Sequence, residues 1–415
     1  MTQIYDDVRI SVQGLAVGMF VSRLDRPWLE TPFPLEGVML KTAAEVDRLQ
    51  RTCSYVYIDT TRGIRPDVRF IEYSHATLVN EIKAKEEVAA LRKVQWTITN
   101  DFESELKIAG EAHGILEVGI REVMDDLQEG NHLDLAKLTD GVEAMIESII
   151  RNPSAFTWLQ QMKRWDSYSY HHALGCAILA SSFGRHLGLE KKDLNILAMG
   201  GMLCDVGKVR LTAELLAKHS SLSAADISLV RRHVAHGVEI VEGTTGISPK
   251  VVEIVASHHE RHNGSGYPNG LKGSEIPIFG RIVGLVDSYD AMTSVRTYAK
   301  IRSPHMAVTE LYESRGMLFQ AELVEQFIQT CGIFPIGTLV ELSSGEVGVI
   351  TAVHSLKRLR PSVMLLLDSE KNPLQGFRTL DMSLVELDQN GDPLSVKSGL
   401  PTGAFGLNTQ ELFLD

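Results

Sequence analysis

The stretch Met199-Gly-Gly-Met-Leu-Cys-Asp-Val-Gly-Lys208 is apolar for most of its length and ends with two charged residues. Its apolar part is typical of a buried helix, and the three-residue spacing places Asp205 and Lys208 one turn apart on one helix face. A carboxylate that is buried in such a helix needs a cationic partner or a metal ion. The stretch therefore indicates a helical core that carries a polar site.

Histidines gather around this stretch. Nine of the fourteen lie between His171 and His262, where an even distribution would place roughly three. Imidazoles and carboxylates fall on separate predicted helices, at His172, Asp205, His233, His258, His259 and Asp287. Nitrogen and oxygen ligands from several helices are what a metal site in a helical bundle requires. Adjacent helical residues point about 100° apart, so His258 and His259 bind two different metals, or one binds a metal and the other contacts substrate or supports a ligand.

Two longer motifs accompany these residues. His258-His-Glu-Arg261 is followed closely by Gly264-Ser-Gly-Tyr-Pro268, and Asp287 begins the segment Asp-Ser-Tyr-Asp-Ala-Met-Thr-Ser-Val-Arg-Thr-Tyr298. With His172, Asp205 and His233 in the same order, roughly residues 165–330 resemble the HD-GYP family of phosphohydrolases. The resemblance implies hydrolysis of the bacterial second messenger cyclic di-GMP to pGpG and GMP at two divalent metal ions, either iron, manganese or zinc.

The resemblance also implies roles for single residues. Asp205 and Lys208 are the expected catalytic residues. The expected metal ligands are His172, Cys204, Asp205, His233, His258, His259 and Asp287. Substrate contacts are expected from Lys208, Gly266, Tyr267, Pro268 and Arg296. Lys208 either contacts the phosphate or only pairs with Asp205, and Asp290 is interpreted as structural.

The sequence departs from the family pattern at four positions. At one of them, Ala299 follows Tyr298 where a basic residue is common, although Lys300 is adjacent. Cys204 stands where the family has the histidine of its His-Asp pair. A thiolate there would alter metal preference and slow catalysis, whereas a protonated, packed thiol would leave one metal or none. Asn263 replaces an aspartate but keeps an acceptor that can shape the loop. Tyr168 replaces a glutamate of members with a third metal, which favours two metals.

The flanking segments predict a multi-domain α+β protein in which an all-α HD-type catalytic module lies between small β-rich units. Residues 1–65 are expected to form a β-rich accessory domain, with strands at Val8–Val12, Met19–Val21 and Tyr55–Ile58. Residues 66–152 are expected to form a helical connector, because apolar residues recur at helical spacing from Val88 to Leu106. Residues 153–333 form the expected phosphohydrolase domain. Residues 334–415 are expected to be β-rich, with a turn at Ser343-Ser344-Gly345.

Composition narrows the class of partner. A net charge of −12 disfavours a nucleic-acid polymer, so an anionic ligand must be small; the ligand that the resemblance implies is cyclic di-GMP. No apolar run is long enough for membrane insertion, and Met1–Ser11 lacks a secretory signal, so a cytoplasmic location is expected. The four dispersed cysteines exclude a disulfide framework and a zinc ribbon. A homodimer or a signalling protein partner remains open.

Two other functions remain open, the first of them because of Cys204. One is a catalytically degenerate sensor that binds cyclic di-GMP or a protein and signals through the flanking units. The other is hydrolysis of a different nucleotide by the same metals.

Overall fold

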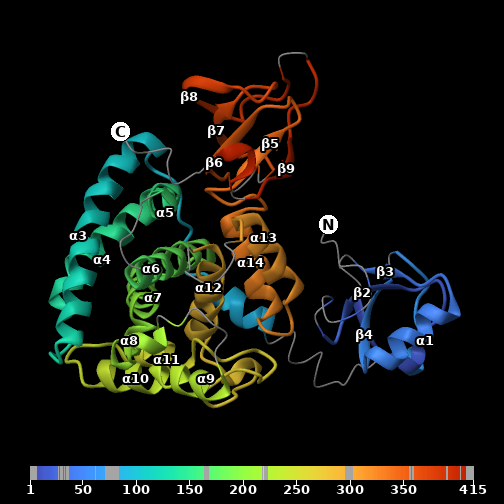
Figure 1. The fold of residues 1–415 in the computed structure, drawn as a ribbon, viewed down its shortest axis with the longest axis horizontal. Helices are drawn as coiled ribbons and strands as arrows, with labels where there is room; N and C mark the ends of the chain where they lie inside the picture. The colour runs from blue at the N-terminus through green and yellow to red at the C-terminus, as the bar shows by residue number, and fades with distance from the viewer. Residues whose placement is uncertain are drawn as a thin grey trace. The chain divides into compact units, whose positions relative to one another are not determined.

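A computed structural model describes residues 7–407 except for several gaps. The gaps are residues 27, 29–30, 32, 34–36, 61, 71–83, 163–167, 217, 219–222, 295–301, 355–356, 358, 389–390 and 402. The chain divides into two compact units, Met1–Glu87 and Val88–Asp415. Figure 1 shows a large helical body with a separate β-sheet toward each end of the chain, so the predicted fold class is confirmed.

The N-terminal unit is an antiparallel sheet with one helix. Its strand order is β1-β4-β2-β3, and its elements are β1 (Asp7–Ser11), β2 (Phe20–Leu24), β3 (Val38–Met39), α1 (Ala43–Thr52) and β4 (Tyr55–Asp59). Helix α1 begins at a capping box in which Thr42 and Glu45 each accept from the other's backbone amide. The three predicted strands are confirmed, whereas β3 and α1 were not predicted.

The helical body contains one continuous apolar core that runs from Ala109 to Phe327. Its helices are α3 (Phe102–Gln128), α4 (Ala136–Arg151), α5 (Pro153–Met162), α6 (Tyr168–Leu187), α7 (Lys191–Leu203), α8 (Ala213–Leu216), α9 (Ala224–Arg231), α10 (His233–Glu242), α11 (Pro249–Ser257), α12 (Ile278–Thr293), α13 (Pro304–Glu313) and α14 (Ala321–Cys331). Helices α3 and α4, from the predicted connector, pack into the same core as α6 and α7. Helices α6 and α10 end directly before Gly188 and Gly243.

The continuous helix predicted from the apolar spacing of Val88–Leu106 is wrong. Only residues 84–90 are helical there, and α3 begins after Asp101, whose carboxylate accepts from the Ser104 amide as an N-cap. The amides of residues 93 and 94 instead donate to the Gly188 carbonyl. Between residue 90 and α3, these two backbone amides therefore form hydrogen bonds with the residue that follows α6, and not within a helix.

The C-terminal part is a five-stranded antiparallel sheet of order β8-β7-β6-β5-β9. Its strands are β5 (Leu339–Leu342), β6 (Val347–Ala352), β7 (Ser362–Leu367), β8 (Pro373–Asp381) and β9 (Val396–Gly399). The predicted turn at Ser343-Ser344-Gly345 joins β5 to β6, and Gly345 adopts φ +87°, a conformation that favours glycine. Trp158 of α5 packs into the apolar core of this sheet.

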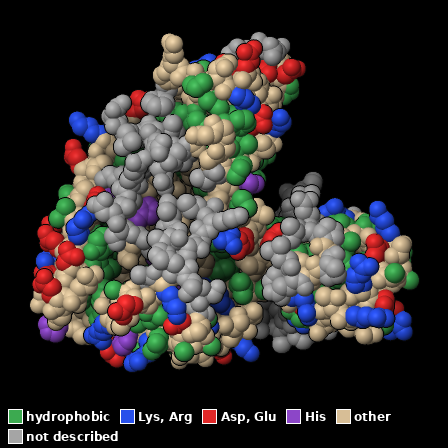
Figure 2. All heavy atoms as spheres, viewed as in Figure 1, with side chains coloured by type: hydrophobic (Ala, Val, Ile, Leu, Met, Phe, Trp, Pro, Cys, Tyr) green, Lys and Arg blue, Asp and Glu red, His purple; other side chains and the backbone are tan. Residues whose placement is uncertain are grey.

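Two properties concern possible partners: the distribution of charged side chains on the surface, and the length and apolar character of the helices. On the face that Figure 2 shows, the visible acidic and basic side chains are interspersed over the helical body. Among the described residues, none of the helices combines the length and the apolar character that crossing a membrane requires.

Candidate metal centre

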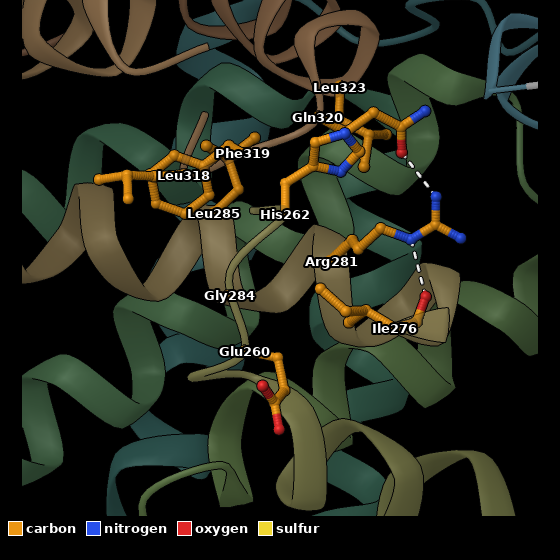
Figure 3. Close-up of a pocket in the computed structure, with 10 residues that line it drawn as sticks. All are labelled: Glu260, His262, Ile276, Arg281, Gly284, Leu285, Leu318, Phe319, Gln320 and Leu323. Carbon is orange, nitrogen blue, oxygen red and sulfur yellow. Dashed lines mark hydrogen bonds between the residues drawn. The ribbon is translucent and has the colours of Figure 1, made fainter. Parts of the chain in front are cut away.

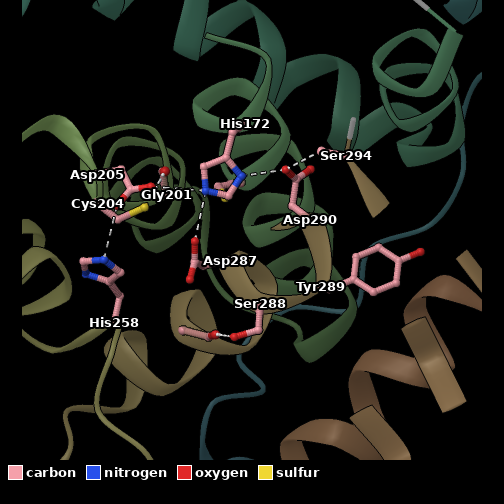
Figure 4. A network of polar contacts seen from close by, with 12 residues as sticks. His172, Gly201, Cys204, Asp205, His258, Asp287, Ser288, Tyr289, Asp290 and Ser294 are labelled. Atoms are coloured by element: carbon pink, nitrogen blue, oxygen red, sulfur yellow. Dashed lines mark hydrogen bonds and ion pairs between the residues drawn. The ribbon is translucent and has the colours of Figure 1, made fainter. Parts of the chain in front are cut away.

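Five segments bring the predicted ligands together. His172 lies on α6, Asp205 follows α7, His233 begins α10, His258 and His259 follow α11, and Asp287 lies on α12. Figure 4 shows His172, Asp205, His258 and Asp287 turned toward one another. The described residues contain two groups whose ligand atoms lie within 4.8 Å of one another. The histidine-rich cluster is Asp205, His233, His258 and His259, and the His172 cluster is His172, Cys176 and Asp287.

Asp205 lies between the two clusters. Its Oδ1 is 3.2 Å from His233 Nε2, and its Oδ2 is 3.3 Å from His172 Nε2. His172 Nε2 is in turn 3.0 Å from Asp287 Oδ1. One carboxylate thus faces the candidate ligand atoms of both groups.

The imidazoles of the histidine-rich cluster have the orientation that metal binding needs. His233 Nδ1 donates to the Val230 carbonyl at 2.7 Å, and His258 Nδ1 donates to the Val255 carbonyl at 2.9 Å. A carbonyl only accepts, so each Nδ1 carries the proton and each Nε2 presents a lone pair. His258 is fully buried, and its Nε2 has no hydrogen-bond partner among the residues that the structure describes.

The spacing of the imidazoles also fits a metal. His233 Nε2 and His259 Nε2 are 3.1 Å apart, and two nitrogens that bind one zinc ion at about 2.1 Å lie at a similar separation. A buried acceptor without a partner costs free energy, and a cation bound at His258 Nε2 would remove that cost. The residues therefore fit a divalent metal.

The protonation states of two residues, Asp205 and His259, suit metal binding as well. Burial acts to raise the pKa of the Asp205 carboxyl, but Lys208 and the neighbouring imidazoles hold that pKa well below its ordinary value. Burial, reinforced by His258, lowers the pKa of His259 well below the ordinary histidine value. An ionised carboxylate and a neutral imidazole are the forms that bind metals.

Asp290 positions the His172 ring. His172 Nδ1 donates to Asp290 Oδ2 at 2.7 Å, and the Ser294 hydroxyl donates to the same oxygen at 2.9 Å (Figure 4). This contact fixes the ring so that Nε2 faces Asp205 and Asp287. Asp290 therefore supports a ligand, in agreement with its interpretation as structural.

Gly175 makes room for Asp290, and its replacement by alanine is expected to disturb the metal centre. A Cβ at Gly175 would lie 2.2 Å from Asp290 Oδ1, so Gly175→Ala should displace the carboxylate and lower metal affinity roughly tenfold or more. Titration of metal-free protein with zinc would measure this affinity. Gly110→Ala is the matched control, because a Cβ at that helical glycine meets nothing within 4 Å; equal affinities in the two variants would contradict the role of Asp290.

The glycine-rich loop after His259 is held against the metal centre. The Glu260 carboxylate accepts from the amides of Asn269, at 2.7 Å, and Leu271, at 3.0 Å. A Cβ at Gly266 would lie 2.4 Å from the Arg261 amide nitrogen, so only glycine allows this approach. Asn263 Oδ1 accepts from the Ser265 amide and hydroxyl, which confirms that asparagine can shape the loop.

Tyr267 of this loop covers part of the histidine-rich cluster. Its ring centroid lies 4.6 Å from that of His259, at an interplanar angle of 30°. The Arg231 guanidinium lies 4.6 Å from the Tyr267 ring centroid, which is within the range of a cation–π contact. Arg231 was not predicted, because nothing in its local sequence indicates that it approaches this ring.

Lys208 and Cys204 make local contacts. The Lys208 ammonium pairs with Asp205 Oδ2, which is one of the two roles predicted for Lys208. The Cys204 thiol is buried and donates to the Gly201 carbonyl at 3.2 Å, and Cys204 belongs to neither cluster in the described residues. Metal binding by Cys204 stays a prediction. Arg296 and the Tyr168 side chain lie outside the described residues.

A small cavity beside the centre is closed by a buried arginine. In Figure 3, Arg281 points from α12 toward Gln320, and its guanidinium donates to Gln320 Oε1 at 2.7 Å and to the Ile276 carbonyl at 2.8 Å. The cavity encloses about 10 Å³, which is room for roughly one water molecule. This volume is too small for a nucleotide. Through its two hydrogen bonds, Arg281 links the start of α12 to the segment before α14.

Comparison of the sequence with known proteins identifies the family of this chain. Residues 145–323 match the model of the HD domain, and residues 7–138 match that of a domain of unknown function, DUF3391. A cyclic di-GMP phosphodiesterase of Pseudomonas aeruginosa is 30% identical over 357 residues, which cover 86% of this chain and 84% of that protein. The chain belongs to the HD-GYP family. The predicted resemblance is thus confirmed.

Two further relatives match a shorter part of this chain. A cyclic di-GMP phosphodiesterase response regulator of Xanthomonas campestris pv. campestris is 34% identical over 164 residues, 38% of this chain and 43% of that protein. A 3'3'-cGAMP-specific phosphodiesterase of Vibrio cholerae is 35% identical over 158 residues, 38% of this chain and 30% of that protein. The similarity of these two relatives therefore covers less than half of either chain.

Proposed function

We propose that this chain is a metal-dependent phosphodiesterase that hydrolyses cyclic di-GMP to pGpG and GMP. The observation that carries the proposal is the position of Asp205, whose two oxygens face two separate groups of metal-ligating atoms. The 30% identical relative from Pseudomonas aeruginosa, a cyclic di-GMP phosphodiesterase whose similarity covers 86% of this chain, supports cyclic di-GMP as substrate. The action is expected in the cytoplasm, where this messenger signals.

The proposed ligands are His172, Asp205, His233, His258, His259 and Asp287, with a cysteine in place of the imidazole that Cys204 replaces. Two divalent cations held there would activate a water molecule and neutralise charge on the scissile phosphate. Imidazoles and carboxylates suit iron, manganese or zinc. Asp205 would bridge the two positions, while Asp290 keeps His172 in place.

Lys208 is the proposed cation for the phosphate. It pairs with Asp205 and keeps 31% of its side chain exposed. An ammonium group has three donors, so pairing with Asp205 does not prevent contact with a phosphate oxygen. Charge that develops on the phosphate in the transition state would strengthen this contact.

The glycine-rich loop is the proposed nucleotide contact, through Gly266, Tyr267 and Pro268, and Arg296 is proposed to join it. Tyr267→Ala should raise KM for cyclic di-GMP about tenfold or more, because stacking of a base on an aromatic ring is worth roughly 1–3 kcal/mol. Tyr267→Phe keeps the ring and should stay near the wild-type value. Steady-state kinetics on both variants would measure this, and an unchanged KM in Tyr267→Ala would contradict stacking.

The test of the function combines metal analysis with a hydrolysis assay on one preparation. Two metal ions per chain and release of pGpG are the expected result. Tight binding of cyclic di-GMP without turnover would instead favour the second candidate function, the sensor. The presence of Cys204 at the position where the family has a histidine supports this candidate. Competition with 3'3'-cGAMP would reveal the alternative substrate that the name of the Vibrio cholerae relative suggests.

A further inference from the structure

We propose that Cys176, rather than Cys204, provides the thiolate that replaces the missing imidazole of the His-Asp pair. This inference rests on the proposed function, since it concerns a ligand of the same metals. The exchange at residue 204 removes a long side chain that would reach the metals. The question is therefore which neighbouring donor can reach the position that the imidazole leaves.

Cys204 is poorly placed for this role. The sulfur of a cysteine lies one bond from Cβ, whereas Nε2 of a histidine lies on the far side of its ring, so the thiol ends much closer to its own backbone. Cys204 Sγ donates to the carbonyl of Gly201 at 3.2 Å. Figure 4 shows Cys204 and Gly201 together, at the end of α7, beside the carboxylate of Asp205. The thiol thus satisfies the backbone of its own helix.

Cys176 lies where a ligand is needed. It is fully buried on α6, one turn after His172, so the two side chains share a helix face. Its Sγ is 3.8 Å from each ring nitrogen of His172. Cys176, His172 and Asp287 offer donor atoms within 4.8 Å of one another.

Asp205 completes the donor set. Its Oδ2 lies 3.3 Å from His172 Nε2, so a second carboxylate lies beside the imidazole of the His172 cluster. Four such ligands match the coordination number of zinc. In the histidine-rich cluster, His258 Nε2 is fully buried, has no hydrogen-bond partner among the described residues and lies 3.9 Å from Asp205 Oδ1, the carboxylate that the two clusters share.

The packing of α6 on α7 explains how Cys176 comes close to the changed residue. A Cβ at Gly201 would lie 2.8 Å from the Cys176 carbonyl oxygen, so the two helices approach closely at this level. The backbone of Cys176 therefore lies beside the helix that ends just before Cys204.

A sulfur ligand would make the two metal positions unequal. The histidine-rich cluster offers nitrogen and oxygen only, whereas the His172 cluster would offer a soft thiolate, which favours zinc or iron over manganese. A thiolate donates more charge than an imidazole, so its cation would be the weaker Lewis acid. The position next to α6 would therefore prefer zinc or iron to manganese.

The test uses cobalt(II) as the probe in the full-length protein. Thiolate ligation gives a charge-transfer absorption in the near ultraviolet that nitrogen and oxygen ligands do not give. Wild type and Cys204→Ser should both show this band and two cobalt ions per chain. Cys176→Ser should lose the band and one of the two ions. Cys331→Ser is the matched control, because this thiol at the end of α14 lies outside both clusters.

A second variant protects the test against misfolding of Cys176→Ser. In the triple variant Cys53→Ser, Cys204→Ser, Cys331→Ser, Cys176 is the sole cysteine, and a retained band would support the proposal directly. Loss of the band there, or its loss in Cys204→Ser alone, would overturn the assignment to Cys176. Two bound cobalt ions without any band would also overturn it but would leave the proposed function standing. Failure to bind cobalt at all would overturn both.

Discussion

Asp205→Asn is expected to abolish binding of both metals and to lower hydrolysis of cyclic di-GMP by at least about a hundredfold. Asparagine keeps the shape of the side chain but loses the charge that faces both clusters. Metal ions contribute several kcal/mol to such reactions, and each 1.36 kcal/mol is a factor of ten in rate. Metal content by elemental analysis and turnover by product separation would measure the two effects.

Asp193→Asn is the control for this variant. Asp193 lies in the first turn of α7 and pairs with Lys250, away from both clusters. The control should keep wild-type metal content and turnover. Two metals retained in folded Asp205→Asn would show that Asp205 does not join the two positions, and the proposed mechanism would fail.

Cys204→His is expected to raise metal occupancy or turnover, because it restores the imidazole of the His-Asp pair. A restored ligand should raise metal affinity by about tenfold or more, the scale on which changes around metal ligands act. The larger ring must fit a buried position, and overpacking costs about 1–3 kcal/mol. Metal titration, turnover and thermal unfolding should therefore be measured together.

Cys331→His, at a half-buried position on α14, is the matched control and should change neither quantity. Unchanged metal affinity and turnover in a folded Cys204→His variant would indicate that residue 204 does not occupy a ligand position. The result also bears on the sensor alternative. A large gain in turnover would identify Cys204 as the cause of weak catalysis in the natural chain.

Much of the candidate site could be predicted from sequence, because helical ligands and their motifs are local signals. His258-His259 and the glycine-rich loop are contiguous, and Asp205 is conspicuous inside an apolar stretch. The structure brings these residues together with His172, His233 and Asp287. The β5–β6 hairpin was predictable for the same reason, since Gly345 marks its turn.

The remainder depends on contacts between distant segments. Cys176 follows His172 by one turn, but only the packing of α6 on α12 shows that its sulfur lies near Asp287. Arg231 meets Tyr267 across 36 positions of the chain. The spacing from Val88 to Leu106 predicted a helix, because apolar spacing does not reveal that the Gly188 carbonyl accepts two amides from this segment.

The shared core of α3, α4, α6 and α7 has a consequence for what counts as the autonomous folding unit. The HD-domain match begins at residue 145, inside α4. Leu116 and Ile120 of α3, together with Leu138 of α4, precede that boundary and are fully buried. The HD-domain match is therefore smaller than the buried core that holds the helices of the candidate site together.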